Sequence, residues 1–231
     1  MKKFIRSCRF RFAALCVSAL FVFQLGYAGM SDVDTIKTRL GPYTLDIPET
    51  NSLEGKAPFW IAMIPGLDSG AKSTNIIFSS DEVAASIPGL DPETELLGTL
   101  HYVTEEEYNT TRHHPFGVDL WYGRGAHKHK TFEPWEGTGL YRAFYAQHHK
   151  KVFWEVVRML PDPSRPPPDD IQDFFVANCS GDFDAGKSSC STSVLFDRLL
   201  VEFSVQEPHL LRIEEIRQFI QEKVSSWIVS E

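Results

Sequence analysis

The stretch Ser193-Val-Leu-Phe-Asp-Arg-Leu-Leu-Val-Glu-Phe-Ser-Val205 decides the fold class of this chain. Two runs of apolar and β-branched residues, 193–196 and 199–205, flank the dipeptide Asp197-Arg198, a spacing typical of a β-hairpin. An amphipathic helix is predicted next, from Pro208 to Val229. Its apolar residues recur at spacings of three and four: Leu210, Ile213, Ile216, Ile220, Val224 and Trp227. Such a stripe usually packs on a core, so we expect the helix to lie on the sheet that contains the hairpin.

The rest of the chain is rich in short strand-like runs, many with β-branched or aromatic residues. They are Tyr43–Ile47, Phe59–Ile64, Asn75–Ser79, Leu96–Val103, Val118–Tyr122, Leu140–Ala146, Val152–Met159 and Phe174–Ala177. Short helices are expected after Ser79, where Ser79-Ser-Asp-Glu82 resembles a capping box, and at Thr104–Glu107. With many strands and no strand–helix alternation, the sequence predicts an α+β fold: a mainly antiparallel sheet with the C-terminal amphipathic helix packed on it.

The N-terminus has the three parts of a signal peptide. A basic region precedes the apolar stretch Phe12–Leu25, and the small residues Gly26 and Ala28 follow at the positions expected before a cleavage site. The apolar stretch is too short to cross a hydrocarbon core, which takes about 20 residues. We therefore expect residues 1–28 to be removed and 29–231 to form a single periplasmic domain without a membrane span. The proline-rich connector 160–170 is where that domain would divide, if it has two parts.

The charge of the processed chain narrows the class of partner. Removal of residues 1–28 leaves 18 Lys and Arg against 31 Asp and Glu, a formal net charge of −13 in place of −8. A strongly acidic protein is a poor ligand for nucleic acid or for an anionic membrane surface. A basic protein partner is the better expectation, beside the simpler interpretation that the charge keeps the protein in solution.

Cysteine usage agrees with export. Cys8 and Cys16 leave with the leader, so that Cys179 and Cys190 are the only cysteines of the processed chain. An isolated pair in an oxidising compartment is expected to form a disulfide. The predicted role is structural, because redox-active pairs usually lie two residues apart.

One nucleotide-binding pattern occurs in the sequence. Gly181-Asp-Phe-Asp-Ala-Gly-Lys-Ser188 satisfies G-x-x-x-x-G-K-[ST], which acts as a phosphate loop when a helix follows it. Here serines and strand-forming residues follow, and Asp182 and Asp184 would repel phosphate. We interpret the segment as a polar turn closed by the disulfide, and we expect no cofactor.

Histidines are concentrated between residues 101 and 149, at His101, His113, His114, His127, His129, His148 and His149. His127 and His129 would share one face of a strand, but Lys and Arg crowd the region and no metal-ligand spacing such as H-E-x-x-H appears. A metal site in this segment is the minor alternative, and we predict none. Because hydrolase motifs are also missing, we predict no catalytic residues and no enzymatic activity.

Four aromatic residues near the histidines, Trp121, Tyr122, Phe132 and Trp135, are candidate anchors for a protein partner, since interface energy concentrates in such side chains. Packing in the core is the alternative for each of them.

The layout of the chain resembles that of periplasmic immunity proteins of type VI secretion effectors. The resemblance covers the leader, Gly41-Pro-Tyr-Thr-Leu-Asp-Ile-Pro48, the Cys179 and Cys190 pair, the hairpin and the terminal helix, without a diagnostic motif. It implies a non-enzymatic protein that neutralises a periplasmic toxin by binding it. Two alternatives stay open, an envelope accessory protein and an exported enzyme that uses metal through the histidine-rich segment.

Overall fold

The computed structural model describes residues 34–53, 73–112, 115–145 and 151–229. Asp34 and Thr35 belong to one compact unit, Met1–Thr35, and the other described residues belong to a second unit, Ile36–Glu231. The predicted leader and the strand-like run Phe59–Ile64 lie outside the described residues. Among the residues that are described, no helix has the length and apolarity needed to cross a bilayer.

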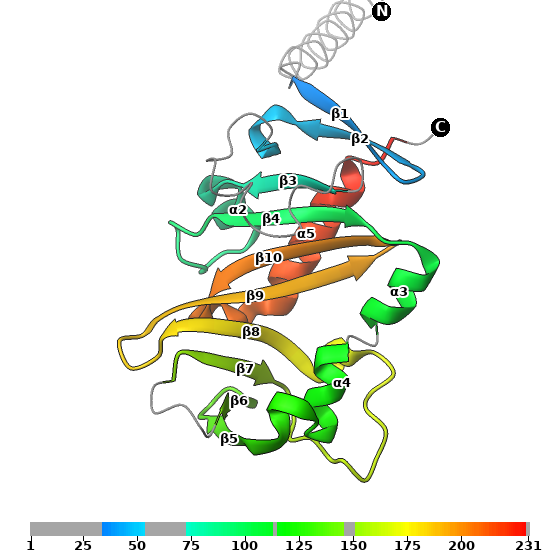
Figure 1. Cartoon of the computed structure of the whole chain (residues 1–231). Helices are drawn as coiled ribbons and strands as arrows, with labels where there is room; N and C mark the ends of the chain where they lie inside the picture. The colour runs from blue at the N-terminus through cyan, green and yellow to red at the C-terminus, as the bar shows by residue number, and fades with distance from the viewer. Residues whose placement is uncertain (1–33, 54–72, 113–114, 146–150, 230–231) are drawn as a thin grey trace, which may run out of the picture. The chain divides into compact units, whose positions relative to one another are not determined.

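An eight-stranded sheet in the order β3-β4-β10-β9-β8-β7-β6-β5 forms the centre of the second unit, and each of its ladders is antiparallel (Figure 1). Strands β5 to β10 are neighbours in both sequence and space, so that β4 beside β10 is the one pairing of distant segments in this sheet. A separate two-stranded sheet contains β1 and β2. The bounds are β1 Thr35–Leu40, β2 Tyr43–Pro48, β3 Ser73–Phe78, β4 Leu96–Tyr102, β5 Lys130–Trp135, β6 Leu140–Tyr145, β7 Phe153–Val157, β8 Phe175–Asp182, β9 Lys187–Phe196 and β10 Leu199–Gln206.

Four α-helices are described, namely α2 Ser80–Ser86, α3 Glu105–Arg112, α4 Pro115–Tyr122 and α5 Ile213–Ser226. Helix α2 begins as predicted at Ser79, whose hydroxyl accepts a hydrogen bond from the amide of Glu82. Thr104 and Glu107 form a reciprocal capping box at α3, with hydrogen bonds of 2.7 and 3.2 Å. Short 3-10 segments lie at Glu49–Asn51, Gly125–His129, Ile171–Asp173 and Glu207–Arg212.

The predicted fold class and C-terminal hairpin are confirmed. Strands β9 and β10 are joined by Asp197 and Arg198, which have φ values of 44° and 64° and therefore make the left-handed turn that suits a two-residue hairpin. The predicted apolar stripe of the last helix is buried. Its first part, Glu207–Arg212, is a 3-10 helix, and the α-helix ends at Ser226, three residues before the predicted end.

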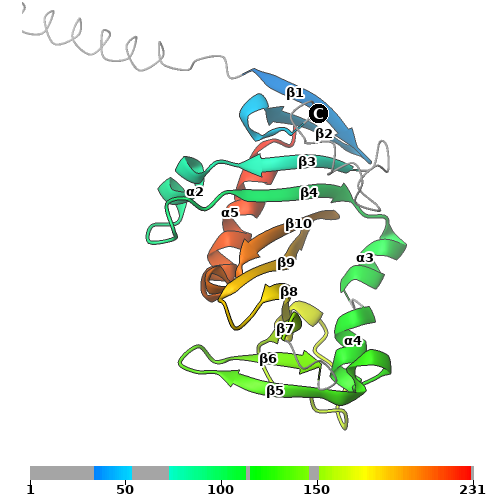
Figure 2. The ribbon, with the colours of Figure 1, turned by 60° about the vertical axis from the view of Figure 1, so that its left-hand side comes forward.

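The two faces of the large sheet are covered by different helices, which lie on opposite sides of it (Figure 2). On the face that we call the α5 face, Phe78 of β3 packs edge-on against Phe219 at 5.2 Å and stacks on Trp227 at 5.7 Å. On the other face, the α4 face, a second apolar cluster joins helix α4 to β6, β7 and the segment before β8. Its buried members are Leu120, Trp121, Ala143, Val157, Ile171 and Phe174.

Three local predictions were wrong or incomplete. Residues Val118–Tyr122 were predicted as a strand, but they form the last part of α4, because Leu120 and Trp121 both bury themselves in the second cluster. His127 and His129 lie in a 3-10 segment and not on a strand. Strands β1 and β5 were not predicted, and both have exposed residues at alternate positions rather than a continuous apolar run.

Candidate interaction surface

Trp121, the first of the four predicted partner anchors, lies in the interior of the protein. Its side chain is 4% exposed and meets the ring of Phe174 edge-on at 5.0 Å. The indole Nε1 donates a hydrogen bond to the carbonyl of Arg165 at 2.9 Å, which fixes the proline-rich connector against helix α4. These contacts assign Trp121 a packing role in the free protein, and its function as an anchor stays a prediction.

The other three candidates are half-buried and do not form one patch. Phe132 and Trp135 lie three residues apart in β5, so their side chains leave opposite faces of the strand. Phe132 packs against the second cluster on the α4 face, whereas Trp135 packs against the main core. Tyr122 lies under the guanidinium of Arg124 at 4.4 Å. A partner that used all three residues would have to contact both faces of the sheet.

Trp135 belongs to a cluster of aromatic rings and cations at the β5 end of the α5 face. The guanidinium of Arg142 lies 4.1 Å from the ring of Trp135 and 5.0 Å from that of Phe183. Its Nε donates to Glu207 at 2.8 Å, and the same carboxylate oxygen accepts a hydrogen bond from Trp154 at 2.8 Å. Arg142 is therefore held in place by a buried carboxylate between two aromatic rings.

The predicted disulfide joins Cys179 of β8 to Cys190 of β9, which face each other in the ladder. The phosphate-loop pattern lies in the turn between these strands. Gly186 donates a backbone hydrogen bond to Phe183, and β9 begins at Lys187. A strand follows the pattern where a phosphate loop would need a helix, so that the interpretation as a polar turn is confirmed.

The histidine-rich segment is described only in part, since His113, His114, His148 and His149 lie outside the described residues. Of the remaining three, His101 contacts Glu202 at 3.2 Å, His127 is buried and His129 is exposed. Burial lowers the pKa of His127. The described residues contain no group of three or more His, Cys, Asp or Glu side chains that would hold a metal ion.

A buried ion pair lies beside His127 on the α4 face. Lys130 of β5 contacts Glu155 of β7, and the side chains of both are almost completely inaccessible to solvent. The ammonium lies 3.6 Å from the ring of Tyr145, whose hydroxyl donates to Glu155 at 3.3 Å. Burial lowers the pKa of Lys130 to about 7. This pair could not be predicted from the sequence, because its members are 25 residues apart in two different strands.

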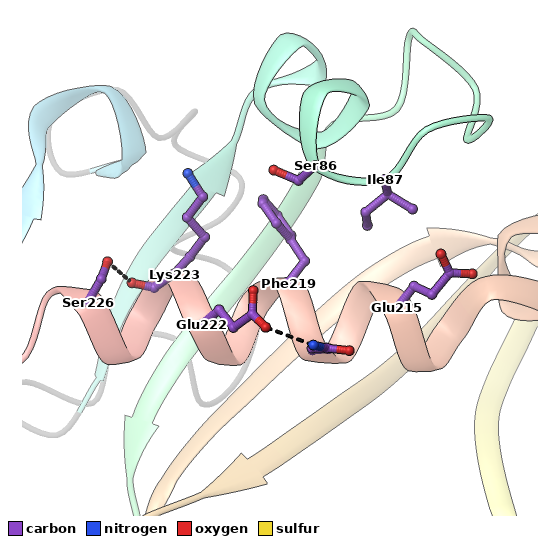
Figure 3. A pocket seen from close by; sticks show the side chains of 8 residues that line it. Ser86, Ile87, Glu215, Phe219, Glu222, Lys223 and Ser226 are labelled. Atoms are coloured by element: carbon purple, nitrogen blue, oxygen red, sulfur yellow. Dashed lines mark hydrogen bonds between the residues drawn. The ribbon is translucent and has the colours of Figure 1, made fainter.

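A surface groove of about 360 Å³ lies between α2 and α5 (Figure 3). Phe219 reaches from α5 towards Ser86 of α2, and Glu215 and Glu222 lie along the helix on either side of it. The lining residues are Ser86, Ile87, Glu215, Gln218, Phe219, Glu222, Lys223 and Ser226. Sequence analysis did not find this groove, since its two walls are more than 120 residues apart in the chain.

No protein-family model matches the chain, and no curated protein matches it. The geometry defines an α+β protein with an antiparallel sheet and a C-terminal helix on one face. A solved structure of similar fold is that of an immunity protein of the Stenotrophomonas maltophilia type IV secretion system. The two chains are 12% identical, the TM-score is 0.50, and the match covers 86% of this chain and 94% of that chain. At this identity the match shows a common fold.

Proposed function

We propose that this protein is a non-enzymatic immunity-type inhibitor, which neutralises a protein toxin by binding it one to one. The observation that carries the proposal is the fold match to a secretion-system immunity protein along nearly the whole of both chains. The layout of the sequence independently resembles immunity proteins of type VI effectors, whereas the solved neighbour belongs to a type IV system. The sequence layout and the solved structure both indicate an immunity protein, and the assignment to a type VI system stays a prediction.

The proposal includes export to the periplasm and a basic partner. The order of basic, apolar and small residues in 1–28 supports export, and the disulfide between Cys179 and Cys190 is consistent with an oxidising compartment. N-terminal sequencing of protein from a periplasmic extract should find a chain that begins just after Ala28. The net charge of −13 that processing would leave supports a basic partner.

The test of function is co-expression in the periplasm with the product of a toxin gene adjacent to that of this protein. Cells that export the toxin should survive only when this protein also reaches the periplasm, and light scattering on the purified mixture should give the mass of a one-to-one complex. The same protein without residues 1–28, retained in the cytoplasm, is the matched control and should fail to protect. Death of the co-expressing cells, with no complex on size-exclusion chromatography, would contradict the proposal.

A further inference from the structure

The α2–α5 groove has an apolar floor and a polar rim. Phe219 and Ile87 contribute buried apolar surface, with 5% and 2% of their area exposed. Phe219 is fixed by its edge-on contact with Phe78 of the sheet. The rim consists of the side chains of Glu215, Gln218, Glu222, Lys223 and Ser226 from α5 and Ser86 from α2. A floor and rim of this kind fit a side chain with an apolar stem and a polar head.

The cations that border the groove are already paired with carboxylates. Arg212 makes two hydrogen bonds to Glu215, and Lys223 contacts Glu82 of α2 at 2.5 Å. Glu222, by contrast, accepts a 2.8 Å hydrogen bond from the neutral amide of Gln218, and within the described part of the chain it has no ion pair. The charge of Glu222 is therefore available to a cation from outside the chain.

The segment that borders the groove on its α2 side adds further negative charge. Between Ser80 and Glu95 the sequence has no Lys or Arg and has carboxylates at Asp81, Glu82, Asp91, Glu93 and Glu95. All of these except Glu82 are exposed. Arg212 of the last 3-10 turn donates a 2.7 Å hydrogen bond to Pro88, which holds this acidic segment beside the start of α5. The groove consequently lies within an acidic surface.

We propose that the α2–α5 groove receives an Arg or Lys side chain from a basic segment of the protein partner, an inference that rests on the proposed function. The aliphatic stem would lie on Phe219 and Ile87, and the cationic head would form a charge-assisted hydrogen bond with Glu222. The exposed carboxylates of Asp81, Asp91, Glu93 and Glu95 would attract the basic segment during encounter.

The experiment compares two adjacent residues of α5 in the full exported protein. Glu222→Gln and Gln221→Arg both raise the net charge by one, but only residue 222 lines the groove, and both side chains are exposed. Affinity for the partner of the co-expression experiment is measured by calorimetry, and association rates are measured at several salt concentrations. We expect Glu222→Gln to weaken binding by about 10-fold, with a smaller salt dependence, and Gln221→Arg to change it by less than about 3-fold.

The outcomes separate this inference from the proposed function. If the wild-type protein binds its partner and the two variants bind equally well, the groove is not the docking site, although the function stands. If the wild-type protein forms no complex at all, both proposals fail. If light scattering shows a homodimer that Glu222→Gln dissociates, a second copy occupies the groove and the inference is wrong. Equal unfolding midpoints of both variants and the wild type ensure that a loss of binding is not a loss of folding.

Discussion

The eight-stranded sheet has two halves that differ in how their α4 face is covered. In the half formed by β3, β4, β10 and β9, helix α5 covers one face, while residues on the other face, such as Leu97, Glu202 and Ser204, are exposed. In the half formed by β5 to β8, helix α4 covers that other face with an apolar cluster, and an ion pair is buried on the same face beside His127. The difference shows that equivalent positions of one sheet face are buried in one half and exposed to solvent in the other.

The largest expected effect on the free energy of unfolding comes from truncating Trp121, which is buried under α4. It is compared with truncation of Leu97, which is exposed on the same face. Trp121→Ala should lower the free energy of unfolding by about 3 to 5 kcal/mol, since it leaves a cavity under α4 and frees the carbonyl of Arg165. Leu97→Ala, at a residue 43% exposed, should change it by about 0.5 kcal/mol or less. Urea unfolding followed by circular dichroism measures both, and equal effects would contradict the contrast between the halves.

The second prediction contrasts a buried ion pair with an exposed one in the same half. Glu155→Leu should destabilise the protein by about 3 kcal/mol at pH 6, because it leaves the ammonium of Lys130 buried without its carboxylate. The double variant Lys130→Met/Glu155→Leu should regain most of that loss. Lys151→Met, which removes the half-exposed pair with Glu133, should cost about 1 kcal/mol or less. A double variant no more stable than the single one would show that the apolar pair does not fit.

The third prediction concerns the covalent link between the halves. The disulfide joins β8 to β9, whose ladder runs from Asn178 opposite Ser191 to Asp182 opposite Lys187. Replacing both cysteines by serine should lower the free energy of unfolding by about 2 to 3 kcal/mol and leave the circular dichroism spectrum unchanged. Reduction of the wild-type protein should give the same loss, and a reduced protein as stable as the oxidised one would rule out this role.

The smallest expected effect is a pH dependence of the free energy of unfolding, which arises from Lys130 in the β5–β8 half. In the folded protein burial lowers the pKa of Lys130 to about 7, whereas a lysine in the unfolded chain keeps its usual value near 10.5. Between these values the unfolded chain binds the extra proton, so stability should increase as pH rises, by about 1 kcal/mol between pH 7 and 8. Unfolding midpoints of the wild type and of Lys130→Met at both pH values test this. A parallel pH dependence in the variant would assign the effect to other groups.

Prediction from the sequence succeeded for elements with a long periodic pattern of apolar residues. It failed for elements whose pattern covers only a few residues. Six apolar residues at helical spacing identified the C-terminal helix, and a two-residue gap identified the β9–β10 hairpin. The five residues Val118–Tyr122 have strand-forming composition, but a window of this length does not distinguish a strand from one buried turn of helix. Edge strand β5 contains Lys130 and Pro134, which made it resemble a loop.

The candidate surface was harder to predict than the fold, because it is assembled from distant segments. Trp121 was selected for its residue type, but burial gives it a packing role that composition does not reveal. The groove unites α2 with α5, and the one signal for it in the sequence is the run of carboxylates from Asp81 to Glu95 without a single Lys or Arg. That run indicates an acidic surface, but pairing within the chain decides which carboxylates are available.

The junction between β4 and β10 has a consequence for how the chain folds. Strands β5 to β10 follow one another in sequence, so their turns close quickly, whereas Tyr102 meets Leu199 only after closure of a loop of about 100 residues. We therefore expect β5 to β10 to form the folding nucleus. In folding kinetics, mutations in these strands should mainly slow folding, whereas mutations in the β3–β4 pair, which docks late, should mainly speed unfolding. During synthesis from the N-terminus, β3 and β4 would therefore be made first but would join the large sheet last.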